Sequence, residues 1–212
     1  MKHLIIIGAR GWGRECYWTA QNTSGYGKTY DIKGFLDSDS HALDGLNGTY
    51  PPILGSVEEY SIKPDDVFFC AMGDPKWRKH YAELIETKGG NFISLISPLA
   101  IINANVTIQP GCCIGACTIV SDNVCIEKHA LIHGFCTIGH DCHIDEYASI
   151  FSYVFLGGCS NIGKMAIMHP KSMLIAHKSI GNEVIVGAGS VVMRNIKDGL
   201  HVHGNPAVKI DY

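Results

Sequence analysis

Residues 99–194 decide the fold of this chain, and in blocks of six they read LAIINA NVTIQP GCCIGA CTIVSD NVCIEK HALIHG FCTIGH DCHIDE YASIFS YVFLGG CSNIGK MAIMHP KSMLIA HKSIGN EVIVGA GSVVMR. The fourth place of every block is apolar and aliphatic, from Ile102 to Val192. The second place is small or β-branched in every block except the one that carries Lys178. A period of six fits neither the 3.6 residues per turn of an α-helix nor the 3.5 of a coiled coil. Because places two and four alternate as in a strand, each block is predicted to be one short strand and a bend.

Three such blocks close a triangular coil of about 18 residues, and successive coils stack at the strand spacing of about 4.8 Å. Burying one aliphatic side chain stabilises the fold by roughly 1.5–3 kcal/mol. The inward column alone therefore provides a large apolar core. In an ordinary β-sandwich, the same spacing would arise only by coincidence.

The blocks resemble the hexapeptide repeat of the left-handed β-helix acyltransferases, over residues 97–208. This resemblance implies a left-handed parallel β-helix, a handedness that the period of six does not itself establish. It also implies a homotrimer with active sites between neighbouring subunits.

Residues 1–90 have a different pattern, in which strands, turns and helices alternate as in a parallel α/β domain. We therefore predict a Rossmann-like α/β domain over residues 1–92 and a β-helix domain over residues 93–212. The expected strands cover residues 4–7, 32–36 and 67–71, and the expected helices cover residues 14–22 and 77–88.

A glycine-rich turn, Gly8 to Gly13, follows the first predicted strand. Such a turn lets the backbone approach a ligand, and the helix start behind it favours a phosphate. The spacing is G-x-x-G-x-G and not the dinucleotide-binding G-x-G-x-x-G. Taken alone, the motif fits a structural tight turn equally well.

Together with residues 35–39, residues 71–74 and Arg78, this turn resembles the N-terminal domain of a group of bacterial sugar acetyltransferases. The group is related to sialic acid O-acetyltransferase and to the enzyme that N-acetylates a 4-amino sugar for protein glycosylation. There, the small domain holds the nucleotide diphosphate of the sugar substrate. Arg10 replaces the usual glycine and could pair with the phosphates. The resemblance implies a nucleotide-sugar site lined by Gly8, Arg10, Gly11, Gly13, Asp37 and Gly73.

The pair His140–Asp141 is the candidate catalytic centre. Acetyl transfer needs a base for the nucleophile's proton, and a histidine with an ordinary pKa near 6.5 suits this task when a carboxylate orients it. One coil later the same bend holds Gly158, which we expect to leave room for a ligand. The residues alone fit a surface histidine at a subunit contact equally well. The resemblance implies His140 as the base and Asp141 as its orienting carboxylate.

For the cofactor, the resemblance implies acetyl-CoA as the acyl donor, bound along the bends of the later coils. Ser149 stands where many relatives have a second histidine, and His169 and Lys171 stand where relatives often have small residues. The implied cofactor-binding residues are Ser149, Gly158, Pro170, Gly187, Ala188 and Arg194.

Composition excludes several other classes of protein. The net charge of -3 argues against a nucleic-acid binder. No apolar run reaches the length of a membrane span, and Leu4–Ile7 is too short for the core of a signal peptide, so we expect a cytoplasmic protein. The nine cysteines are odd in number and contain no C-x-x-C pair. We expect those in the repeat to be small buried residues and not disulfides.

Three other functions remain open at this point. A carbonic anhydrase of the γ class shares the β-helix and binds zinc through three histidines. Here His133 and His169 are two coils apart, but the position of the third ligand is Leu174, so no metal is expected. The second alternative is a protein that binds a nucleotide sugar without catalysis. The third is an O-acetyltransferase that acts on a sialic acid or another sugar hydroxyl. The prediction is N-acetylation of a nucleotide-linked amino sugar in bacterial surface glycan biosynthesis.

Overall fold

The computed structural model describes residues 1–210 of the chain. Its internal contacts divide the chain into two compact units, Met1–Pro98 and a second unit that begins at Leu99. The division falls a few residues after the boundary expected between residues 92 and 93. We describe each unit separately.

The first unit has a three-stranded sheet that is parallel, as the sequence predicts, and its strand order is β2-β1-β3. Within residues 1–210, neither helix has the length and apolar character that crossing a bilayer would demand. The elements of this unit are β1 (Lys2–Ile7), α1 (Gly11–Asn22), β2 (Tyr30–Leu36), β3 (Asp66–Cys70), α2 (Pro75–Thr87) and the short strand β4 (Leu95–Ile96).

The two helices cover opposite faces of this sheet. Tyr17 of α1 packs against Phe35 of β2, with ring centroids 5.9 Å apart. The next residue, Leu36, joins a different cluster, which contains Ile85 of α2. Because successive strand residues point to opposite faces, α1 and α2 lie on either side of the sheet, which is the Rossmann-like arrangement.

Helix α1 begins at Gly11, three residues before the expected start at Arg14. The first turn of the helix lies directly against the end of β1, because a Cβ on Gly13 would come within 1.9 Å of the Gly8 carbonyl oxygen. Gly13 is therefore needed for close packing of helix on turn. The glycine-rich motif is both the turn and the helix start.

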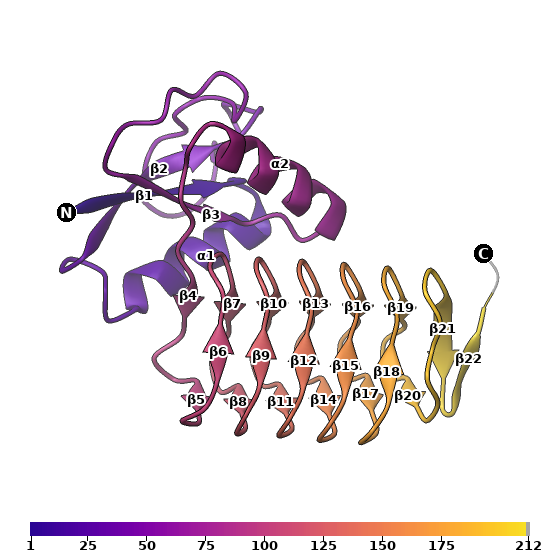
Figure 1. Ribbon diagram of the computed structural model, residues 1–212. Coiled ribbons are helices and arrows are strands. Elements are labelled where there is room, and N and C mark those ends of the chain that lie inside the picture. The colour runs from indigo at the N-terminus through magenta and orange to yellow at the C-terminus, as the bar shows by residue number, and fades with distance from the viewer. Residues whose placement is uncertain (211–212) are drawn as a thin grey trace. The chain divides into compact units, whose positions relative to one another are not determined.

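The second unit is a left-handed parallel β-helix with three sheets, and each row of short arrows in Figure 1 is one sheet. Within this unit, sheet I has the order β22-β21-β19-β16-β13-β10-β7, sheet II β20-β17-β14-β11-β8-β5 and sheet III β18-β15-β12-β9-β6. All pairs are parallel except the β21–β22 hairpin.

The strands of sheet I in this unit are β7 (Cys113–Ile114), β10 (Leu131–Ile132), β13 (Ser149–Ile150), β16 (Ile167–Met168), β19 (Ile185–Val186), β21 (His201–Gly204) and β22 (Ala207–Lys209). Those of sheet II are β5 (Ile101–Ile102), β8 (Ile119–Val120), β11 (Thr137–Ile138), β14 (Phe155–Leu156), β17 (Met173–Leu174) and β20 (Val191–Val192). Those of sheet III are β6 (Thr107–Ile108), β9 (Cys125–Ile126), β12 (His143–Ile144), β15 (Asn161–Ile162) and β18 (Ser179–Ile180).

The inward columns predicted from the repeat are confirmed. From Ile114 to Val192, every fourth-place side chain is at most 2% exposed. Second-place cysteines such as Cys112, Cys136 and Cys142 are also buried. Strand partners lie one coil apart, as Ile114, Ile132 and Ile150 show. Aliphatic side chains of successive coils therefore stack directly on one another.

The corners have a backbone conformation that the sequence did not reveal. From residue 111 to residue 189, the first place of each block has a positive φ, and in twelve blocks the residue is not glycine. A left-handed conformation costs an L-residue roughly 1–2 kcal/mol. Most of the N–H groups at these places donate to the preceding coil, as Asp141 does to the Asp122 carbonyl at 3.1 Å. The ladder of hydrogen bonds therefore continues through the corners and offsets part of the strain.

A partly buried ion pair joins the outer strands of the first unit. Lys33 Nζ lies 2.7 Å from Asp66 Oδ1, while the Tyr60 hydroxyl and the Lys63 backbone N–H both donate to Asp66 Oδ2 at 2.8 Å. Burial raises the pKa of Asp66, but these hydrogen bonds outweigh it, so the net pKa is lowered.

We predict that Asp66→Asn lowers the free energy of unfolding by about 1.5–3 kcal/mol near neutral pH, because it removes a charge-assisted hydrogen bond. A lowered carboxyl pKa adds stability above its unfolded value near 3.9, and this stability is lost as pH falls through the folded pKa. Urea denaturation from pH 6 to about pH 3 should therefore show a steeper loss for wild type than for the variant. Asp65→Asn, at an exposed neighbour, is the control. Equal pH dependence of wild type and Asp66→Asn would contradict this account.

Candidate active site

His140 and Asp141 lie at the corner between β11 and β12, where the chain passes from sheet II to sheet III. Neighbouring residues in a strand point to opposite faces. The φ of 57° at Asp141 breaks that alternation and turns its carboxylate toward His140. As a result, His140 Nδ1 lies 2.6 Å from Asp141 Oδ2. The predicted catalytic pair is therefore brought together by the conformation of the corner.

Asn123, one coil earlier, completes this group. Its Nδ2 donates to Asp141 Oδ1 at 2.6 Å, and the two residues are 18 positions apart. The Asn123 amide, followed by the His140 ring, lowers the pKa of Asp141. Because an ionised carboxylate only accepts hydrogen bonds, the neutral imidazole of His140 that fits this contact has its proton on Nδ1 and a lone pair on Nε2. The arrangement can accept a proton at Nε2.

Gly158 lies beside the imidazole, one coil after His140. A Cβ on Gly158 would come within 2.6 Å of His140 Nε2 and 2.8 Å of Cε1. The space that we expected a ligand to fill is therefore bordered by the edge of the His140 ring itself. The absence of a side chain at Gly158 leaves space for the His140 ring. Contact between Gly158 and a cofactor stays a prediction.

His140 is open to solvent within one chain. Its side chain is 65% exposed and that of Asp141 is 46% exposed. Arg194 belongs to the same column as His140 and Gly158, since the strands before them are in register. It lies three coils further on, about 14 Å away at the usual strand spacing. A long ligand extending along this corner would pass from the base to a cation.

The other predicted cofactor residues lie elsewhere on the β-helix. Pro170, Gly187 and Ala188 follow β16 and β19, at the corner between sheets I and II. Ser149 lies in β13 and is only 1% exposed, so its burial does not favour direct contact with a cofactor. The predicted cofactor-binding residues at corners are therefore divided between two corners, with sheet II between them. Within one chain, these residues do not come together in a single site.

The histidines considered for a zinc site are separated by an aromatic ring. The centroid of the Phe151 ring is 4.7 Å from that of His133, which is tilted against it, and 5.5 Å from that of His169, which is stacked on it. Phe151 therefore lies between the two imidazoles. Burial lowers the pKa of His169, which favours its neutral form. Leu174, at the third ligand position, points inward and is fully buried. Within one chain, these residues do not form the carbonic anhydrase site.

The first unit contains a pocket of about 550 Å³ above the glycine-rich turn. Five of the six predicted substrate-binding residues line it; Gly11 does not. Sequence reasoning missed its aromatic wall, in which Trp77 and Tyr81 stack at 5.9 Å. Their spacing of four residues on α2 was the available signal, since it places both on one helix face. The predicted residues in the lining are Gly8, Arg10, Gly13, Asp37 and Gly73, and Trp12 and Met72 also contribute.

Polar groups around this pocket have distinct tasks. Asp37 accepts a hydrogen bond from the Ala9 N–H at 2.8 Å and so fixes the glycine-rich turn. The buried Arg78 donates to the Met72 carbonyl at 2.7 Å and holds the opposite loop. The Arg10 side chain is mostly exposed, and its nearest carboxylate oxygen, on Asp39, is 3.8 Å away. Because this contact is long, the guanidinium can still bind an anion.

Comparison with known proteins agrees with both units. Residues 3–85 match the family model described as PglD N-terminal domain. The acetyltransferase domain of PglB from Neisseria gonorrhoeae FA1090 is 26% identical, with a TM-score of 0.88 over 99% of this chain and 100% of that one. That domain is also known in complex with acetyl coenzyme A. Over its whole length, the chain is therefore similar to an acetyltransferase domain that has the same two-part fold.

Two more distant structures share the fold of this chain. A histidine variant of perosamine N-acetyltransferase from Caulobacter crescentus, in complex with CoA and GDP-perosamine, is 20% identical with a TM-score of 0.89 over 100% of this chain and 98% of that one. WeeI from Acinetobacter baumannii AYE is 23% identical with a TM-score of 0.75 over 99% and 100%. No curated protein sequence matches the chain.

We predict that Gly158→Ala in this acetyltransferase lowers kcat by about 10²-fold, because the new methyl group must displace the His140 ring by roughly 1 Å. Steady-state kinetics of acetyl transfer would measure the loss, and circular dichroism would verify the fold. In a His140→Ala background the same substitution should add little further loss, since no ring remains to be displaced. Additive losses in the double variant would contradict this explanation.

Proposed function

We propose that this acetyltransferase moves the acetyl group of acetyl-CoA to the amine of a nucleotide-linked amino sugar, with His140 as general base. The observation that carries the proposal is the chain Asn123–Asp141–His140, which leaves Nε2 as a proton acceptor at an exposed corner. The amine attacks the thioester carbon and gives its proton to Nε2. The C–S bond then breaks, and CoA leaves as the thiol once it has taken up a proton.

The pocket of the first unit supports the proposal that the acceptor sugar carries a nucleotide, which this pocket would bind. Trp77 and Tyr81 offer a flat apolar wall against which a base can stack. Arg10 and the start of α1 offer positive charge and N–H groups to a diphosphate. The complex of perosamine N-acetyltransferase with GDP-perosamine is an example of such an acceptor in a protein of the same fold.

A panel experiment tests the reaction and the acceptor together. The purified protein is incubated with acetyl-CoA and UDP-, dTDP- and GDP-linked sugars, with amino and hydroxy members of each, and the products are analysed by mass spectrometry. We expect one acetyl group on an amino sugar, stable to mild alkali as an amide is. His140→Ala should lower kcat by about 10²–10⁴-fold.

Each other outcome has a definite meaning. An alkali-labile product on a hydroxy sugar would keep the reaction class and replace the amine by a hydroxyl. Acetyl-CoA binding without any product would direct the search to free sialic acids. Near-full activity of His140→Ala would exclude it as the base.

We also propose that the active site is completed by a second copy of the chain, in a trimer. The outer face of sheet II lies between the two corners that share the predicted residues. It carries exposed apolar side chains that solvent would not favour on a monomer. Phe135 and Tyr153 extend this surface, stacked at 5.0 Å. The exposed side chains on sheet II are Ile101, Ile119, Phe155 and Met173.

We therefore predict a particle of three times the 23.1 kDa chain mass in light scattering. Phe155→Asp should shift it toward the monomer and reduce activity, because burying an unpaired carboxylate in an apolar contact is unfavourable. Leu46→Asp, at an exposed apolar residue of the first unit, is the control. A monomeric wild type, or a Phe155→Asp variant that remains a trimer, would refute this surface as the contact.

A further inference from the structure

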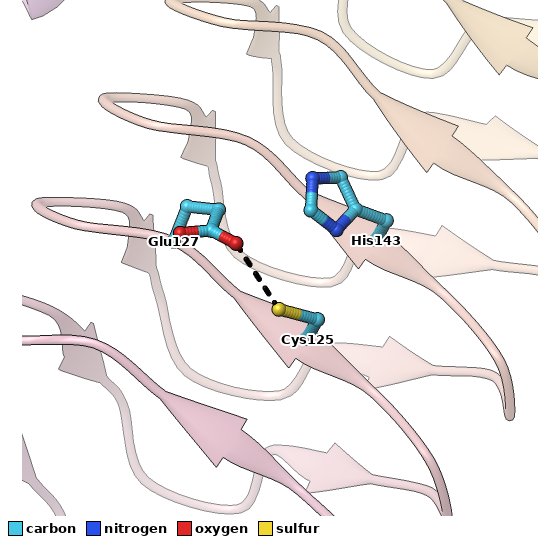
Figure 2. Close-up of side chains that lie close together, drawn as sticks. All are labelled: Cys125, Glu127 and His143. Atoms are coloured by element: carbon cyan, nitrogen blue, oxygen red, sulfur yellow. Dashed lines mark hydrogen bonds between the residues drawn. The ribbon is translucent and has the colours of Figure 1, made fainter.

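Three side chains with metal-binding atoms gather on the outer face of sheet III. Figure 2 shows Cys125 and Glu127 on one coil and His143 on the next, with their side chains directed toward one another. All three are half-buried, and their ligand atoms lie within 4.8 Å of one another. None of them belongs to the chain of hydrogen bonds that orients His140.

The register of the β-helix explains why they meet. Cys125 in β9 pairs directly with His143 in β12, so their side chains are neighbours on the sheet. Glu127 is two residues after Cys125 and therefore points to the same face. Cys125 donates to Glu127 Oε1 at 3.2 Å, the hydrogen bond drawn in Figure 2. The backbone holds all three without requiring a flexible loop.

This group lacks a positive charge. Among residues 1–210, Glu127 forms no ion pair, and the His143 ring makes no hydrogen bond. A half-buried carboxylate beside a thiol and an imidazole is an environment that a cation would stabilise.

We propose that Cys125, Glu127 and His143 bind one divalent cation of the zinc class. A sulfur and a nitrogen donor favour zinc over calcium or magnesium, which prefer oxygen ligands alone. A tetrahedral site has ligand atoms roughly 3.3–3.8 Å apart, so small side-chain rotations would close the group around the ion. The thiol gives its proton to solvent as the metal–sulfur bond forms. Thiolate and carboxylate then balance the charge of the ion, and water occupies the fourth position.

The site has a structural consequence for the catalytic corner. Asn123 is two residues before Cys125, and Asp141 is two residues before His143. A metal joining Cys125 to His143 would therefore link the same two coils that the Asn123–Asp141 hydrogen bond links. The ion stabilises the register of these coils and takes no part in acetyl transfer. This inference departs from the sequence-based expectation that no metal is bound, and it does not depend on the proposed acceptor.

A second cluster, His140, Asp141 and Cys159, also satisfies the distance criterion. It is more exposed, and its imidazole and carboxylate already bond to each other. Because each cluster contains one cysteine, the two can be distinguished by Cys125→Ser and Cys159→Ser. Cys117→Ser, at an exposed cysteine outside both clusters, is the matched control.

The experiment uses the full chain after chelation and dialysis. Titration with Co²⁺ reports thiolate ligation through charge-transfer absorption in the near ultraviolet, and calorimetry with Zn²⁺ reports stoichiometry. We expect one ion per chain and a rise in Tm on adding Zn²⁺. Cys125→Ser should abolish the absorption band. His143→Ala and Glu127→Gln should lower affinity by more than the roughly 10–100-fold that loss of an outer-shell partner costs.

The controls determine how other outcomes are read. Cys117→Ser and Cys159→Ser should retain the band and the rise in Tm. Loss of the band in Cys159→Ser but not in Cys125→Ser would assign the metal to the other cluster and overturn the proposal. Less than one ion per chain in wild type, or an unchanged band in Cys125→Ser, would overturn it as well. If Cys125→Ser failed to fold, unchanged Zn²⁺ affinity in His143→Ala would serve as the contradicting result.

Discussion

The backbone hydrogen bonds between successive coils are the constraint on which the β-helix of the second unit depends. They fix residues 18 positions apart directly beside each other, so an aliphatic residue at one fourth place must rest on the next. Even the strained corners follow this rule, since their N–H groups donate to the coil before. Any residue at a corner therefore has a fixed neighbour above and below it. A side chain can be positioned with little cost in conformational entropy, because the backbone is already ordered.

The His140 corner shows how this constraint creates a site. Asn123 reaches Asp141 because they occupy the same place in adjacent coils, and Gly158 admits the imidazole for the same reason. The left-handed φ at Asp141 provides the remaining contact with His140. None of these residues needs a loop to close around it. The corner is nevertheless exposed, and the predicted cofactor residues are divided between two corners, which is why we propose a second copy of the chain.

The sequence was sufficient to predict the architecture, because a strict period of six leaves few ways to bury the fourth-place column. It also singled out His140 and Asp141, which the structure brings into contact, and five residues that line one pocket, while the roles of these residues stay predictions. It missed the start of α1 at Gly11, because Gly11 and Gly13 were read as part of a turn. In the structure, Gly13 lies in the first turn of the helix and packs against the backbone of Gly8. The sequence also missed Asn123 and the Cys125 cluster, since each depends on a neighbour one coil away and not on a linear motif. It did not predict that the His140 ring lies against Gly158, because the orientation of that ring depends on Asp141.

The central claim is that acetyl transfer takes place at Nε2 of His140. A crystal structure of the protein with CoA and the unreacted amino sugar identified from the panel would test it most directly. The account predicts the acceptor amine within about 2.6–3.2 Å of His140 Nε2, or joined to it by one water, with the CoA sulfur close to the same amine. An amine bound beyond that reach, next to a different proton acceptor, would contradict it.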